Sequence, residues 1–110
     1  MRLLDLEPTL YRFEGERSFA PVPTRGEADS VMFLCPQCFT DNGSPVGTHS
    51  IRIDFIGGKV PPDLAIHNSN GEPVYWNATG NDVRDLTLTP SIQVLHSCNW
   101  HGFVTNGEIV

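Results

Sequence analysis

Two pairs of metal-ligating residues contain every cysteine of the chain. Cys35 and Cys38 are separated by two residues in the first half of the chain, and Cys98 and His101 by two residues near its end. Thiolate sulfur and neutral imidazole nitrogen are preferred ligands of a tetrahedral zinc ion. Because four such ligands close the coordination sphere, the pattern predicts a structural zinc site formed by Cys35, Cys38, Cys98 and His101. His96 is the second choice for the fourth ligand, since it shares a predicted strand face with Cys98.

Two catalytic interpretations of these residues are weaker. A redox-active Cys-Pro-x-Cys pair requires a helix that activates the first thiol, and residues 39–45 are a poor start for one. A catalytic zinc needs an open coordination position and a general base; Asp54 or Glu108 could serve as that base, but the spacing singles out neither. The His-x-Glu signature of zinc deaminases and the His-Glu-x-x-His signature of metalloproteases are both absent. The pattern therefore favours a non-enzymatic metal site.

Short β-strands are the elements expected to position these ligands. Residues 1–30 contain three prolines and keep no regular period, which predicts an extended arm with one edge strand at Leu10–Glu14. Val31–Cys35 is a short apolar run, which is typical of a buried strand that ends at the first cysteine. Residues 49–55 alternate between apolar and polar side chains, which predicts a half-buried strand.

The second half of the chain contains hairpin signals. Apolar residues flank the turn-rich segment 68–73, and they also flank Asn106-Gly107, the strongest short-range hairpin signal. Asp85–Thr89 and Ile92–Cys98 are predicted as two strands separated by Pro90. Only Pro62–Asn68 could form a helical turn. The sequence thus predicts an all-β fold, a small antiparallel sheet or open barrel stapled by one zinc, with an arm at residues 1–30 and the domain at residues 31–110.

Composition limits the classes of partner. The chain has 110 residues and a net charge of −6, with seven basic residues scattered along it, which argues against binding a nucleic-acid backbone. No apolar run approaches the length of about 20 residues that spans a bilayer, so a membrane partner is not expected. Three cysteines exclude a fully paired disulfide framework and suit the reducing cytosol.

The C-terminal third resembles a known family. The segment from Leu86 to Ile92 and the segment from Cys98 to Ile109, together with Cys35-Pro36-Gln37-Cys38, are similar to a family of small phage and prophage proteins. Members have a Cys-Pro-x-Cys start, a Ser-Pro-Ser-like segment and a Cys-x2-His hairpin that ends in Asn/Asp-Gly; some carry an ammonia monooxygenase label, which does not suit a chain of this kind. The resemblance covers residues 31–110, places all four predicted ligands on the family's ligand positions and implies a phage origin.

These observations predict a phage-encoded, zinc-stabilised β module that is not an enzyme. Its expected role is a virion structural or accessory protein, for assembly, cement or connection, whose protein partners belong to the phage capsid or tail. The expected location is the host cytoplasm or the virion. The alternatives are an intracellular inhibitor of a host defence system, which would use the acidic surface, and a zinc-dependent hydrolase.

Overall fold

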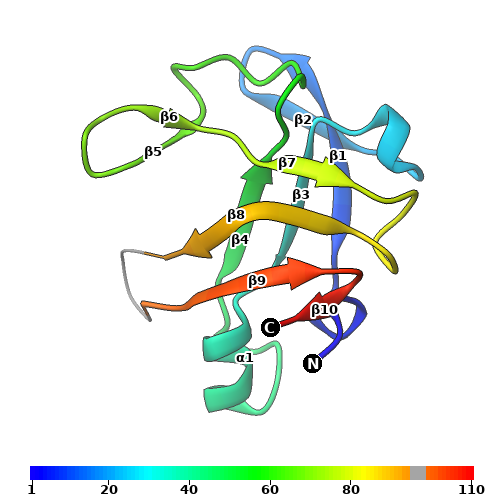
Figure 1. Ribbon diagram of the computed structural model, residues 1–110, viewed down its shortest axis with the longest axis vertical. Coiled ribbons are helices and arrows are strands. Elements are labelled where there is room, and N and C mark those ends of the chain that lie inside the picture. Colours follow the sequence, from blue (N-terminus) through cyan, green and yellow to red (C-terminus); the bar gives the residue numbers. More distant parts are fainter. Residues whose placement is uncertain (95–98) are drawn as a thin grey trace.

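The computed structural model describes residues 1–94 and 99–110 (Figure 1). Its strands are β1 (Thr9–Gly15), β2 (Ser18–Pro21), β3 (Ser30–Leu34), β4 (Ser50–Asp54), β5 (Ile66–His67), β6 (Pro73–Val74), β7 (Asn77–Thr79), β8 (Thr87–Gln93), β9 (His101–Thr105) and β10 (Glu108–Ile109). Its helical segments are the 3-10 turns η1 (Leu3–Leu6) and η2 (Arg25–Glu27) and the α-helix α1 (Pro36–Asn42). The strands form two four-stranded antiparallel sheets, β2-β1-β3-β4 and β10-β9-β8-β7, and the small hairpin β5-β6. The predicted all-β, antiparallel fold is confirmed.

The hydrophobic core lies between the two four-stranded sheets. Phe33 and Ile53 from the first sheet and Leu88, Ile92 and Val104 from the second belong to one cluster of buried side chains. In Figure 1 the strands of the second sheet cross in front of those of the first, and neither sheet closes into a barrel. Removing these apolar faces from water is the main force that holds the two sheets together.

Residues 1–30 belong to this fold, which corrects the expectation of an extended arm. β1 pairs with both β2 and β3 and so lies inside the first sheet. Leu3, Leu6 and Leu10 are buried in the common core, and the N–H of Leu3 donates to the carbonyl of Gly107 at 2.8 Å. Most β1 side chains are only half-buried or exposed, so the alternation that marks a strand is weak in this part of the sequence.

The helix α1 begins immediately after Cys35, where the sequence predicts a turn and no helix. Pro36 occupies the first helical position, and Gly43 ends the helix with φ 67° and an N–H that donates to the carbonyl of Phe39 at 2.9 Å. Seven residues are too few for a 3.6-residue period to be recognised. The helix required by a redox interpretation is therefore present, but it connects antiparallel strands instead of the parallel strands of a thioredoxin-like unit.

Strand β8 runs through Pro90 as one strand, which corrects the prediction of two strands separated there. The Thr89–Pro90 peptide bond is cis, and the pairing with β7 reaches no further than Thr89. On its other side, β8 pairs with β9, and the stretch from Leu88 to Ile92 lies opposite the shorter stretch from Gly102 to Val104. The extra length makes β8 bulge. Proline is tolerated in a strand at a bulge, because no ladder hydrogen bond is lost there.

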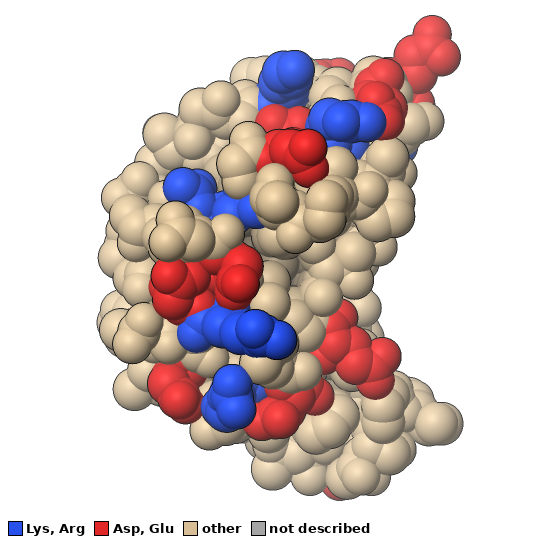
Figure 2. Space-filling model, turned by 90° about the vertical axis from the view of Figure 1, so that its right-hand side faces the viewer, with Lys and Arg blue, Asp and Glu red and all other residues tan. Residues whose placement is uncertain are grey.

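Both predicted hairpins are confirmed. β5 pairs with β6 across the turn-rich segment 68–73, and β9 pairs with β10 across Asn106-Gly107. Asn106 and Gly107 have φ values of 49° and 76°, as a type I′ turn requires. Among the described residues, no helix is long and apolar enough to cross a membrane. On the face in Figure 2, basic and acidic side chains alternate and form no continuous basic surface.

We expect Gly107→Ala to lower the free energy of unfolding by about 2–4 kcal/mol, measured by urea denaturation. A Cβ at Gly107 would lie 2.1 Å from the carbonyl oxygen of Arg84, in addition to the positive φ of 76°. Gly71→Ala is the matched control, since Gly71 has φ 79° and no atom within 4 Å of an added Cβ. Equal losses in the two variants would show that the contact with Arg84 contributes nothing.

Candidate active site

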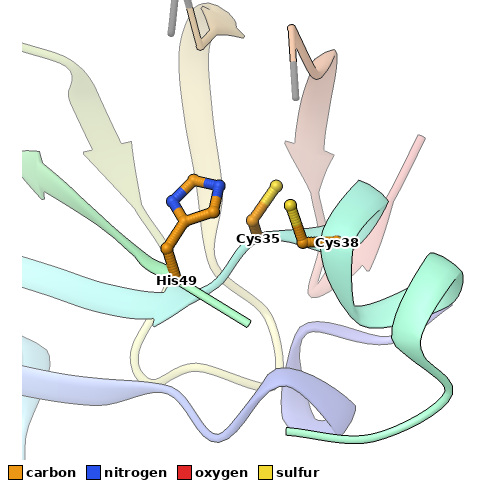
Figure 3. A group of neighbouring side chains, drawn as sticks. All are labelled: Cys35, Cys38 and His49. Carbon is orange, nitrogen blue, oxygen red and sulfur yellow. The ribbon is translucent and has the colours of Figure 1, made fainter. Parts of the chain in front are cut away.

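Three side chains with metal-ligating atoms meet where β3 ends and β4 begins (Figure 3). The sulfur atoms of Cys35 and Cys38 and a ring nitrogen of His49 all lie within 4.8 Å of one another. Cys35 is buried, and Cys38 and His49 are partly exposed. Ligand bonds of about 2.0–2.3 Å place the ligands of a tetrahedral ion roughly 3.3–3.8 Å apart. The group is therefore close enough to hold a metal ion.

Strand register and the helix start bring these three residues together. The N–H of Cys35 donates to the carbonyl of His49 at 2.9 Å, which continues the antiparallel pairing of β3 with β4. Directly paired residues point their side chains to the same side of a sheet. Cys38 lies in the first turn of α1, which follows Cys35 directly. This turn places the sulfur of Cys38 on the same side as Cys35 and His49.

A serine and a histidine form a second pair of reactive side chains on the other sheet. The Nε2 atom of His101 lies 3.0 Å from the hydroxyl oxygen of Ser91, within hydrogen-bond reach. In the register of β8 and β9, His101 pairs with Gln93, so Ser91 is its diagonal neighbour. A hydroxyl held by a histidine in this way is the arrangement that activates serine as a nucleophile.

The bulge in β8 determines how Ser91 is presented. Ser91 lies between Leu88 and Ile92, within the stretch that exceeds the length of its partner on β9. Bulges bend a strand and re-aim side chains, and they are frequent beside active sites. Ser91 is partly exposed and His101 is exposed, so both can be reached from outside the fold.

Trp76 connects the backbone of Ser91 to the first sheet. Its indole Nε1–H donates to the carbonyl of Ser91 at 3.4 Å, and its side chain is 6% exposed. The backbone N–H of Trp76 donates to the carbonyl of Asp54 at 2.9 Å, and its own carbonyl accepts from Ile56 at 2.9 Å. The serine is therefore held from both sheets, which limits its movement relative to the core.

Comparison with known proteins identifies the family. A family model described as bacterial ubiquitination-like system serine protease (BubE) matches residues 7–110. The chain belongs to the BubE family. No curated protein and no solved structure matches the chain significantly.

Membership of the BubE family corrects the expected function. The family description names a serine protease, which is an enzyme, and a bacterial ubiquitination-like system, which implies protein partners. The expected non-enzymatic phage module, with its virion role and its capsid or tail partners, is therefore wrong. The BubE description fits the alternatives better than it fits the main expectation, because one alternative was a zinc-dependent hydrolase. That alternative considered hydrolysis only at a metal ion and did not consider a serine nucleophile.

The predicted zinc ligands that the structure describes do not all lie together. Cys35 and Cys38 lie in the group of three, but His49, which the sequence analysis did not single out as a ligand, is the described residue that accompanies them. His101 lies against Ser91 and is not in that group. Cys98 and His96 lie outside the described residues. The ligand set predicted from spacing remains a prediction.

Sequence reasoning missed Ser91 and His49 for the same physical reason. The importance of each depends on which residue lies opposite it in a neighbouring strand, and local spacing carries no such information. The sequence did contain two weak signals. Ser91 follows Pro90 between two predicted strands, where proline often marks a bulge, and His49 is the first residue of the alternating segment 49–55.

Proposed function

We propose that the chain is a serine peptidase of a bacterial ubiquitination-like system, with Ser91 as nucleophile and His101 as general base. The contact of 3.0 Å between the hydroxyl oxygen of Ser91 and Nε2 of His101 carries this proposal. The family description supports the reaction class, since it names a serine protease.

In the proposed reaction, the oxygen of Ser91 attacks the carbonyl carbon of the substrate while Nε2 of His101 takes the hydroxyl proton. The carbon–nitrogen bond then breaks, and His101 gives that proton to the leaving amine. Water attacks the resulting ester with His101 again as base, which releases the acid and restores the Ser91 hydroxyl. Within residues 1–94 and 99–110, no carboxylate hydrogen-bonds to His101, so the described groups form a dyad.

A fluorophosphonate probe tests the nucleophile directly. We expect Ser91 to form a bond to phosphorus as fluoride leaves and His101 takes the hydroxyl proton. Mass spectrometry of the digested protein should find the adduct on the peptide that contains Ser91. An adduct on another serine, or no adduct under conditions that label a control serine protease, would contradict the proposal.

We also propose that the group of Cys35, Cys38 and His49 holds zinc. Two thiolates and one imidazole are a typical partial ligand set for that ion, and we propose that Cys98, one of the four ligands predicted from the sequence, completes it. β9 starts near this group. Trp100, the residue before β9, contacts Phe33 edge-on with ring centroids 6.4 Å apart, and Phe33 lies in the strand that leads to Cys35. A metal ion bound here would stabilise the fold by linking its ligands, and it would take no part in the proposed reaction.

Variants of His49 and His101 distinguish the proposed metal group from the proposed catalytic pair. We expect His49→Ala to lower the zinc content well below one ion per chain, because it removes a ligand. His101→Ala should keep the zinc and lose hydrolysis, because it removes only the base. Metal analysis after gel filtration, combined with a peptidase assay, measures both effects. Loss of zinc in His101→Ala, with zinc retained in His49→Ala, would instead support the ligand set predicted from spacing.

A further inference from the structure

A groove with a volume of about 690 Å³ lies beside the catalytic serine. Its walls are the outer edge of β4, the hairpin β5-β6 and the end of β8, and Ser91 is part of its lining. The buried apolar side chains of Ile53, Trp76 and Ile92 contribute to its surface. The groove therefore joins an apolar surface to the proposed nucleophile.

The edge of β4 offers unpaired main-chain groups to this groove. The antiparallel register with β3 directs the N–H and C=O groups of Ile51 and Ile53 toward β3, and those of Ser50 and Arg52 to the opposite side. Among the described residues, no hydrogen bond satisfies the main chain of Ser50 or Arg52 on that side. Further along this edge, the carbonyl of Asp54 accepts from the N–H of Trp76 at 2.9 Å, so the edge already binds extended backbone.

The facing edge of β8 is also unpaired. The N–H of Val94 donates to the carbonyl of Trp100 at 2.7 Å, so the register directs the main chain of Gln93 away from β9. β7 covers β8 only as far as Thr89. The main chain of Gln93 thus lies on the groove side without a described partner.

The charge of the lining suits a neutral or acidic chain. The described residues that line the groove include two histidines and Arg52, which is ion-paired with buried Asp54 at 3.0 Å, but no aspartate or glutamate. A neutral or acidic peptide therefore meets no carboxylate among the lining residues, although the whole chain carries a net charge of −6.

We infer that the groove binds the substrate as an extended peptide segment, which adds a strand to the free edge of β4 at Ser50 and Arg52 and brings its scissile carbonyl to Ser91. This inference rests on the proposed function. Main-chain hydrogen bonds at a sheet edge bind an extended peptide, and alternate side chains of that peptide enter the apolar surface. The occupant is a flexible tail or linker of a protein and not a folded surface, because only an extended chain can reach both unpaired edges.

The probe for this inference is acetyl-Ala-Val-Ala-Val-Ala diphenyl phosphonate, compared with acetyl-Ala diphenyl phosphonate. In both, the oxygen of Ser91 bonds to phosphorus and phenol leaves, so the second-order rate of labelling reports how well the peptide part binds. We expect the longer probe to react at least tenfold faster. Single N-methylation along it should slow labelling roughly threefold to tenfold at alternate positions and little between them, since only every second N–H of a strand faces one neighbour.

Two matched variants test the location. Ile66 lines the groove and is 37% exposed, whereas Ile56 is 63% exposed and is not among the groove residues. Ile66→Glu should slow the longer probe at least fivefold more than it slows the short probe, and Ile56→Glu should change neither rate. Equal rates for the two probes, no alternation on N-methylation, or equal effects of the two variants would overturn the groove assignment. Failure of both probes and of fluorophosphonate to label Ser91 would overturn the proposed function, and this inference with it.

Discussion

Replacing Ser91 with alanine is expected to lower kcat for peptide hydrolysis by roughly 10³–10⁶-fold, because no other group would form the covalent intermediate. The hydroxyl is partly exposed and its described hydrogen-bond partner is His101, so we expect the free energy of unfolding to change by less than about 1 kcal/mol. Turnover of a fluorogenic peptide mixture and urea denaturation measure the two quantities on the same preparations.

Ser44→Ala is the matched control for Ser91→Ala. Ser44 is partly exposed, as Ser91 is, but it does not line the groove and is not hydrogen-bonded to a histidine among the described residues, so this variant should keep its activity. His101→Gln combined with Ser91→Ala should cost no more than Ser91→Ala alone, because residues that act as one unit are not additive. Additive losses, or residual activity in Ser91→Ala near that of the unmodified protein, would exclude the Ser91–His101 pair as the catalytic centre.

Replacing Cys35 with serine is expected to remove the metal and to destabilise the fold by about 4 kcal/mol when free zinc is a thousandfold above its dissociation constant. The reason is that an ion that binds only the folded state contributes its binding energy to folding. Cys35 is completely buried at the end of β3, so its loss also leaves a hydroxyl in a site built for sulfur. Denaturation with and without free zinc measures the effect.

A chelator separates these two contributions. It should destabilise the unmodified protein by most of that amount and should change Cys35→Ser little, because the variant has no metal to lose. Cys98→Ser tests the third cysteine of the predicted ligand set in the same assay and should behave like Cys35→Ser. A chelator effect of equal size in the unmodified protein and in Cys35→Ser would show that Cys35 is not a ligand.

The proposed metal site and the proposed dyad lie on different sheets but meet at one groove. His49 and Ser91 both line it, one from the start of β4 and the other from β8. A structural ion at the first position would fix the end of the groove, and the backbone contact from Trp76 fixes Ser91 within it. We therefore expect chemistry at the serine to depend on metal binding only through the shape of the fold.

Local sequence signals were enough to predict the features that depend on neighbouring residues. Alternation over residues 49–55 predicted β4, Asn106-Gly107 predicted the last hairpin, and Cys35 and Cys38 were recognised from their spacing. Each of these signals is local, because side-chain alternation and turn conformation are set within a few residues.

Which residues distant in the chain lie together depends on the three-dimensional fold. His49 joins the cysteines because β4 pairs with β3 in a register that continues to Cys35, and His101 reaches Ser91 because β8 bulges against β9. A shift of one residue in either register would move these side chains to the opposite face of the sheet. Register is fixed by packing across the whole core, so the spacing of the Cys35/Cys38 and Cys98/His101 pairs could predict a metal site but could not reveal that His101 lies against Ser91 in the proposed active site.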